Sequence, residues 1–242
     1  LWLWHAVEES EHKAVAFDVY QDQVNNYWVR TSEMAFTTLE FIGFQTLHYW
    51  QLRNAMTDKT DWKSMADGMK WLLGKNGFLR KLGPAYLSYY KRDFHPNQRD
   101  SRALRDAGLI KLAAMLKHLD IGITVRRMDF RFKDIPRYWA GNDPYFTHLL
   151  NALSATFPEG ERFFVHSVRQ MQDQITDPLL KRQVSAFIGQ EAMHAREHSH
   201  YNDYAIQHGI DLGFIETFIQ KRLTFIKGKY PAERQLAITC DL

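Results

Sequence analysis

The pattern Glu-x-x-His occurs twice in the chain, as Glu9-Ser10-Glu11-His12 and as Glu191-Ala192-Met193-His194. On an α-helix, residues i and i+3 lie on one face about one turn apart, so the Glu and His of each pattern can bind the same ion. Two such helices that face each other provide two imidazoles and two carboxylates, and helix bundles that hold two metal ions add one Glu from each of two further helices. The repeated pattern therefore predicts a dinuclear metal site inside a four-helix bundle.

Both patterns share a helical stripe with apolar residues. The stripes are Phe187, Glu191, His194 and His198, spaced four, three and four residues apart, and His5, Glu9 and His12, spaced four and three. A surface helix places its polar residues opposite its apolar face, so these stripes point polar groups towards a core. Because buried charges are unstable unless they are paired or bound to metal, the arrangement favours a metal site.

A structural explanation competes with metal binding. One Glu-x-x-His on a helix is usually a solvated pair, but two of them in aromatic surroundings, with Glu161 at the start of a further helix, favour metal ligands. His5 and His198 are alternative ligands, but the role that we favour for them is to orient the ligands through hydrogen bonds. The acidic residues that flank the patterns, expected as surface or orienting groups, are Glu8, Glu11 and Glu197.

Helical periodicity and capping residues cover almost the whole chain. They predict an all-α fold, a ferritin-like four-helix bundle with additional helices, in a single helical domain over residues 1–242. The predicted helices are Leu3–Tyr20, Val29–Met56, Trp62–Leu73, Arg102–Leu119, Tyr145–Phe157, one that Pro158 opens, Asp177–His208, one from Asp211 through Phe225, and one from Pro231 towards Leu242. Only Ile121–Phe132 has the character of an extended stretch.

Composition narrows the classes of partner. The net charge is +3, from 31 basic and 28 acidic residues that are scattered along the chain. Proteins that bind nucleic acid usually carry a basic stripe or patch, so we do not expect nucleic acid as a partner. The single cysteine, Cys240, cannot form an intrachain disulfide or a Cys-rich zinc site, and the chain has no leader sequence, so we expect a cytoplasmic protein. The apolar stretch Met34–Trp50 is interrupted by polar residues, and we expect a buried or interface helix there, with contact to a membrane surface as the less favoured alternative.

Three stretches resemble a known family. They run from Trp4 to Asp18, from Phe157 to Phe164 and from Gly189 to His194, and they closely resemble a bacterial family described as predicted metal-dependent hydrolases, a ferritin-like group. The likeness extends from Val125 to Leu242 and from Leu1 to about His95. The metal ligands that the resemblance implies are Glu9, His12, Glu161, Glu191 and His194.

By the same resemblance, the halves of the chain stand in exchanged order. Residues 1–120 resemble the C-terminal half of the family and residues 121–242 resemble its N-terminal half, so natural termini are expected to be joined near Asp120 and Ile121. The family has a segment opening with Glu-His that would follow Leu242 and supply one further carboxylate. The exchange indicates either a circular permutant or pieces ordered and numbered differently from the natural chain, and the mid-helix character of Leu1 favours the second.

Three functions are compatible with such a site. Two ions that share a hydroxide can activate it for hydrolysis, which is the metal-dependent hydrolase that the resemblance implies. The alternative is a non-haem di-iron oxidase or oxygenase, which the bundle architecture favours by analogy. The second alternative is a non-enzymatic bundle that stores metal or is held together by it.

The cofactors and partners follow from the same donors. Imidazole and carboxylate suit two divalent ions, with iron expected first and manganese or zinc as alternatives. We expect a small, apolar substrate and a homo-oligomer, with no nucleic acid. The aromatic residues expected to line an apolar substrate pocket are Trp4, Phe163, Phe164 and Phe187.

Overall fold

The computed structural model describes residues 1–55, 62–75, 77–113 and 123–240, and the junction expected near Asp120 and Ile121 lies outside them. Within these residues every regular element is a helix, which confirms the predicted all-α bundle. The α-helices are α1 (Trp2–His12), α2 (Val15–Gln23), α3 (Tyr27–Ala55), α4 (Trp62–Leu73), α5 (Phe78–Tyr89), α6 (Arg102–Ala113), α7 (Pro144–Arg169), α8 (Pro178–Gln207), α9 (Gly213–Lys229) and α10 (Ala232–Cys240). Two short 3-10 helices are η1 (Pro96–Gln98) and η2 (Gln172–Gln174).

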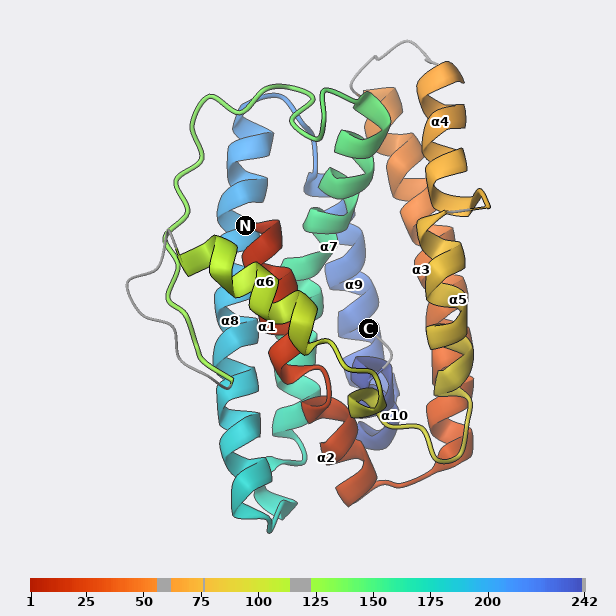
Figure 1. Ribbon diagram of the computed structural model, residues 1–242, viewed down its shortest axis with the longest axis vertical. Coiled ribbons are helices and arrows are strands. Elements are labelled where there is room, and N and C mark those ends of the chain that lie inside the picture. Colours follow the sequence, from red (N-terminus) through yellow and green to blue (C-terminus); the bar gives the residue numbers. More distant parts are fainter. Residues whose placement is uncertain (56–61, 76, 114–122, 241–242) are drawn as a thin grey trace.

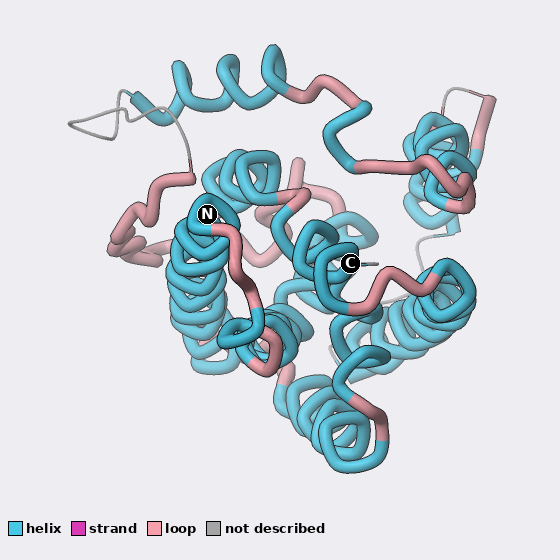
Figure 2. The backbone as a smooth tube through the Cα atoms, turned by 90° about the horizontal axis from the view of Figure 1, so that it is seen from below, coloured by secondary structure: helices cyan, strands magenta, loops and turns pink. Residues whose placement is uncertain are grey.

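The long helices α7 and α8 run side by side, with α7 in the middle of the bundle and α8 at its left in Figure 1. α9 and α3 also pack against α7, while α1 and α2 lie against α8. α10 packs between α2, α3 and α7, and α6 covers the outer face of α1. Figure 2, a view from below, shows many of the helices nearly end on, as expected for a bundle. The α1, α7 and α8 helices, which carry the Glu and His patterns, therefore meet in the interior.

The start of α7 and of α8 follows the predicted capping chemistry. The side chains of Asp143 and Asp177 accept hydrogen bonds from backbone N–H groups, and each is followed by Pro at the first helical position. The prediction that Pro158 opens a separate helix is wrong, because Pro158 lies inside α7. Proline there removes the hydrogen bond to the carbonyl of Ser154. Asn202 Nδ2 donates to that carbonyl at 3.2 Å, so α8 satisfies the group that Pro158 leaves unpaired.

One further predicted helix has the wrong limits, and one helix of the structure was not predicted. The helix expected over residues 3–20 is divided into α1 and α2 at Lys13 and Ala14. At this break Lys13 Nζ donates to Arg99 O at 2.6 Å and to Ser101 Oγ at 3.0 Å, contacts with a distant part of the chain. α5 was not predicted, because it contains Pro84 in its interior.

The expected extended stretch over residues 121–132 forms no strand in its described part, residues 123–132, and runs along α8 instead. Val125 fits against α8 because Gly189 has no side chain. A Cβ atom at residue 189 would lie only 2.6 Å from Val125 Cγ2. The backbone N–H of Phe130 donates to Glu197 Oε2 at 3.0 Å. The segment thus covers the part of α8 that carries the second Glu-x-x-His pattern.

The stretch Met34–Trp50 lies within α3. In the described part of the chain, no helix combines the length and the apolar character needed to cross a membrane. α3 packs one side against α7 and α10, and leaves Phe36, Leu39 and Ile42 exposed on the other.

Candidate metal centre

The structure brings all the predicted ligands together between α1, α7 and α8. His12 Nε2 lies 3.2 Å from Glu9 Oε2 and 2.9 Å from Glu191 Oε1. His194 Nδ1 lies 3.4 Å from Glu9 Oε1. Glu161 is buried in the middle of α7 and faces the same cluster. Three helices therefore contribute carboxylates and imidazoles to one buried site.

His5 also faces these carboxylates. Its Nε2 atom lies 3.0 Å from Glu9 Oε1 and 3.8 Å from Glu161 Oε1, although the sequence favoured an orienting role over metal binding. His198, the other residue expected to orient ligands, contacts His5 and is buried. The structure therefore places His5 as close to the carboxylates as the predicted imidazole ligands.

The donor atoms form four overlapping groups, in each of which all atoms lie within 4.8 Å of one another. The groups are His5–Glu9–His194, His5–Glu161–His198, Glu9–His12–Glu191 and Glu161–Glu191–His194. Glu191 belongs to two groups, and so does Glu9. Carboxylates shared in this way are suited to bridge two ions that lie side by side.

Several of these buried atoms lack a hydrogen-bond partner. They are both carboxylate oxygens of Glu161, Oε2 of Glu191 and Nδ1 of His194. An unpaired polar atom in the interior costs about 1–3 kcal/mol, and more when it is charged. Since all four atoms face the same cluster, a cation among them would satisfy them together. The donor set therefore fits a metal site.

Access to the cluster is on the side of Glu9. The Glu9 side chain is 42% accessible, whereas those of His5, His12 and His194 are 10%, 2% and 0% accessible. An ion or a small molecule can therefore reach the cluster next to Glu9, while the imidazoles stay protected from solvent.

The charges within the cluster are arranged unequally. Burial, and then the charge of Glu191, raise the pKa of Glu161 well above its usual range. Desolvation of the Glu9 carboxylate by its neighbours acts in the same direction, but the charge of His12 and hydrogen bonds from imidazoles outweigh it and hold the pKa of Glu9 well below its usual range. Burial opposes protonation of His12, yet the charge of Glu9 raises the pKa of His12 well above its usual value. A cation beside Glu161 would favour its ionised form.

Each imidazole that faces the carboxylates has its other nitrogen held by the protein. His12 Nδ1 donates to Gln190 Oε1 at 2.8 Å, and His194 Nε2 donates to Glu8 Oε2 at 3.1 Å. Burial opposes protonation of His194, but this hydrogen bond to Glu8 contributes to raising its pKa to about 10. Such bonds fix the ring orientation and the tautomer of metal-binding histidines.

A chain of hydrogen bonds fixes the tautomer of His5. Asn202 Nδ2 donates to Glu216 Oε1 at 3.1 Å, so Asn202 Oδ1 accepts from the hydroxyl of Ser154 at 2.8 Å. The Ser154 oxygen then accepts from His198 Nδ1 at 2.8 Å. Burial lowers the pKa of His198 to about 2, so this ring carries one proton and its Nε2 accepts from His5 Nδ1 at 2.9 Å. His5 is thus held through Nδ1, and its Nε2 atom faces the carboxylates.

A buried ion pair supports the outer side of α1. Arg126 Nη1 lies 3.0 Å from Glu8 Oε1, and Arg126 Nη2 lies 2.7 Å from Glu11 Oε1. Gln190 Nε2 donates to Glu11 Oε2 at 2.9 Å. The arrangement joins the segment after residue 123 to both α1 and α8, next to the residues that hold His12 and His194.

Sequence reasoning found only some of the residues that orient the imidazoles. Glu8 and Glu11 were expected as surface or orienting groups, and the structure places both in the interior. Arg126, Gln190 and Ser154 had no assigned role, and only the position of Gln190 directly before Glu191 offered a signal.

The aromatic residues near the patterns pack against the imidazoles and the core. Trp4 lies edge to face against His194, with ring centroids 4.8 Å apart, and Phe187 lies in the same way against His12 at 4.9 Å. Phe163 packs with Ile226 in the core. These rings therefore form apolar walls behind the donor groups.

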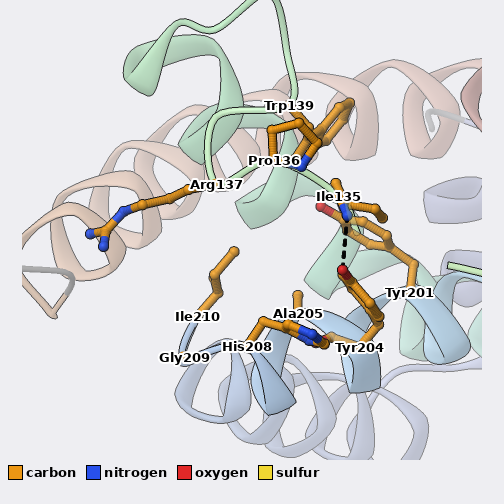
Figure 3. A pocket seen from close by; sticks show the side chains of 10 residues that line it. All are labelled: Ile135, Pro136, Arg137, Trp139, Tyr201, Tyr204, Ala205, His208, Gly209 and Ile210. Atoms are coloured by element: carbon orange, nitrogen blue, oxygen red, sulfur yellow. Dashed lines mark hydrogen bonds between the residues drawn. The ribbon is translucent and has the colours of Figure 1, made fainter. Parts of the chain in front are cut away.

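A pocket of about 220 Å³ lies beyond these walls, at the end of α8 (Figure 3). It is lined by Ile135, Pro136, Arg137, Trp139, Tyr201, Tyr204, Ala205, His208, Gly209 and Ile210. None of the candidate donors borders it. Trp139 stacks on Trp2 with centroids 6.5 Å apart, and Trp2 packs on His198 at 5.2 Å. A layer of aromatic rings thus separates the pocket from the donor groups.

Comparison with known proteins identifies the family. A family model described as predicted metal-dependent hydrolase matches residues 1–100 and 124–242, which together contain every candidate donor. No curated protein and no solved structure matches the chain. The two matched stretches leave out residues 101–123, the region in which the junction of the two halves is expected. Since the match covers most of the sequence, the chain belongs to the family of predicted metal-dependent hydrolases.

Proposed function

We propose that the chain is an enzyme that holds two divalent metal ions in a ferritin-like bundle, between α1, α7 and α8. The observation that carries this proposal is the position of Glu191, which belongs both to the group with Glu9 and His12 and to the group with Glu161 and His194. One carboxylate shared by two donor groups is suited to bridge two ions.

The other donors divide between the two ions. Glu9 and His12 would hold one ion, and Glu161 and His194 the other. We include His5 as a ligand in place of the favoured orienting role, because its Nε2 atom faces Glu9 and Glu161. His198 would orient His5, because both nitrogens of its own ring are already hydrogen bonded.

Hydrolysis is the reaction that we propose first, in line with the family description. Bound ions would supply Lewis acidity and lower the pKa of water to near neutrality. The protein would contribute rigid imidazoles, held by Gln190 and Glu8, and an apolar wall of Trp4 and Phe187 that limits the entry of water. A small substrate would enter beside Glu9, the accessible donor.

Oxidation by a di-iron site is the second candidate. The donors are carboxylates and imidazoles without thiolates, which suit iron and manganese as well as zinc. They lie on the helices of a bundle and are surrounded by aromatic rings, an arrangement used by di-iron carboxylate proteins. The proposal of an apolar substrate belongs to this candidate.

Metal content of purified Glu191→Gln, compared with the wild-type chain, tests the site. We expect about two ions per wild-type chain and loss of both in Glu191→Gln. Glu197→Gln is the matched control, because Glu197 is a buried carboxylate on the same helix that belongs to none of the donor groups. Full metal content in Glu191→Gln, with circular dichroism unchanged in both variants, would refute the proposal.

The reaction class needs a second measurement. Anaerobic loading with ferrous iron, followed by oxygen and recorded by absorbance, would give a transient signal for the di-iron oxidase and none for the hydrolase. Zinc- or manganese-loaded protein that cleaves chromogenic esters or phosphoesters, and loses this activity in Glu191→Gln, would support hydrolysis.

A further inference from the structure

One side of the molecule exposes many large apolar side chains. This side is formed by α3, α4 and α5, which lie together at one edge of the bundle (Figure 1). Six of these side chains, each between 45% and 72% exposed, are Leu39, Ile42, Trp62, Leu73, Leu79 and Leu87. We call these six residues and the helix faces around them the α3–α5 surface. Large apolar patches on the surface of monomeric proteins usually mark a site that binds a partner or a membrane.

The packing of α4 explains why its apolar residues face outwards. Gly68 lies against the ring of Tyr145 on α7, and a Cβ atom at residue 68 would come within 2.2 Å of that ring. Ser64, one turn earlier, donates to Asp143 Oδ1 at 3.2 Å. α4 therefore binds the bundle through its small residues and leaves Trp62 and Leu73 in solvent. α5 packs against α4 and is largely exposed.

The same region is strongly basic. Residues 62–92 contain seven Lys and Arg residues and one acidic residue, Asp67, whereas the whole chain has a net charge of only +3. The four basic residues around the turn between α4 and α5 are Lys70, Lys75, Arg80 and Lys81. All four are exposed, and none forms an ion pair with an acidic residue in the described part of the chain. The rest of the molecule therefore carries a net negative charge.

We propose that the α3–α5 surface binds an anionic lipid membrane, with α4 and α5 lying at the level of the headgroups. Amphipathic helices that combine Trp and Leu with Lys and Arg bind in this way, with the apolar side chains in the acyl boundary and the cations at the phosphates. Long basic side chains keep their charge in the headgroup region while their stems cover apolar surface. Since no described helix is long and apolar enough to cross a bilayer, the chain would lie on the membrane.

Charge decides between a membrane and a second copy of the chain. A symmetric dimer built on this surface would bring two basic faces of the same sign together, which is unfavourable. An anionic membrane instead provides negative charge along the whole surface. The proposal does not depend on metal binding, because none of its residues belongs to the donor groups.

Co-sedimentation of the full chain with vesicles tests the proposal. We expect binding to vesicles of phosphatidylcholine and phosphatidylglycerol, weak binding to phosphatidylcholine alone, and loss of binding at high salt. The variant K70Q/K75Q/R80Q/K81Q should bind the anionic vesicles on the order of a thousandfold more weakly. Trp62→Ser with Leu87→Ser should also release the protein, because these side chains would enter the acyl boundary.

A charge-matched control separates surface binding from a general effect of net charge. The variant K181Q/R182Q/K221Q/K229Q also removes four exposed positive charges, from α8 and α9, and should bind as the wild type does. Equal loss of binding in both quadruple variants, with circular dichroism unchanged, would overturn the proposal. A wild-type dimer in solution that dissociates when Trp62 and Leu87 are replaced, without binding to vesicles, would overturn it as well.

Discussion

The donor cluster and the α3–α5 surface depart from the usual pattern of burial in opposite ways. In the cluster, Glu161 and Glu191 are buried with oxygens that lack a hydrogen-bond partner. On the surface, Leu39 and Leu87 are exposed with no apolar cover. Unpaired polar groups in the interior and apolar side chains in water are both unfavourable in free energy. A ligand that binds at either place can remove that cost. The difference indicates which species: a cation for the cluster and a lipid surface for the exterior.

The two regions also differ in how far the protein itself compensates. Around the cluster, nearly every imidazole nitrogen that points away from the carboxylates has a partner, such as Gln190 for His12 and Glu8 for His194. On the α3–α5 surface, neither the apolar side chains nor Lys70 and Lys75 have such partners in the described residues. The interior is therefore prepared for its ligand with fixed geometry, whereas the exterior relies on non-directional contact.

Two tryptophans give the largest expected contrast. Trp4 is 0% exposed beside His194, and Trp62 is 65% exposed on α4. Trp4→Ala should lower the free energy of unfolding by about 3–5 kcal/mol, because it leaves a cavity in the core. Trp62→Ala should change it by less than about 0.5 kcal/mol. Urea unfolding followed by circular dichroism measures both, and equal losses would show that the surface is part of the folding core.

The buried ion pair gives the next effect. Arg126→Ala should destabilise the fold by about 3 kcal/mol, because it leaves Glu8 and Glu11 buried without their cation. The loss is expected at the lower end of the range for buried pairs, since Glu11 keeps its bond from Gln190. Arg127→Ala is the matched control, because this neighbouring Arg is exposed. Similar unfolding midpoints in urea for the two variants would contradict the role of Arg126.

A smaller effect is expected within the hydrogen-bond chain to His5. Ser154→Ala removes the hydroxyl that joins His198 to Asn202 and leaves two buried groups unpaired. We expect a loss of about 1–3 kcal/mol in the free energy of unfolding. Ser185→Ala, at an exposed position of α8, should have almost no effect. If Ser154→Ala also left the free energy of unfolding unchanged, the hydrogen-bond chain to His5 would not stabilise the interior.

The smallest expected effect is a change in how the free energy of unfolding depends on pH. It concerns a buried residue of α3 that belongs neither to the donor cluster nor to the exposed face of α3. His48 on α3 is buried beside the rings of Phe44 and Phe218, and burial lowers its pKa below the usual value of 6.5. The unfolded chain therefore binds a proton at residue 48 more readily than the folded chain, so stability falls as the pH drops below about 6.5. His48→Leu should make this fall shallower, whereas His200→Gln, at an exposed residue, should leave it unchanged. Thermal unfolding between about pH 7 and pH 5 measures the slopes.

Helical spacing was enough to predict which donors share a face. The stripe of Glu9 and His12 and the stripe of Glu191 and His194 do face each other, and Glu161 joins them from α7. The all-α fold followed from the same periodicity, because one helical face after another is apolar. Local pattern is a reliable guide where the contact lies one helical turn away.

Contacts between distant segments could not be predicted in this way. Pro158 looked like a helix start, and only Asn202, from another helix, explains why α7 continues through it. Arg126 and Ser154 act through partners that lie far away in the sequence, so their local surroundings give no sign of their role. The orientation of the His5 ring likewise depends on four other residues.

The hydrogen bond between His5 and His198 joins residues 193 positions apart. Closing so long a loop carries a large entropic cost, so the cluster can form only when most of the bundle has already folded. A ligand bound there would consequently stabilise the whole fold rather than one helix, by about 1.4 kcal/mol for each tenfold rise in its free concentration. The melting temperature of the chain should therefore serve as a sensor of occupancy, independently of any activity assay.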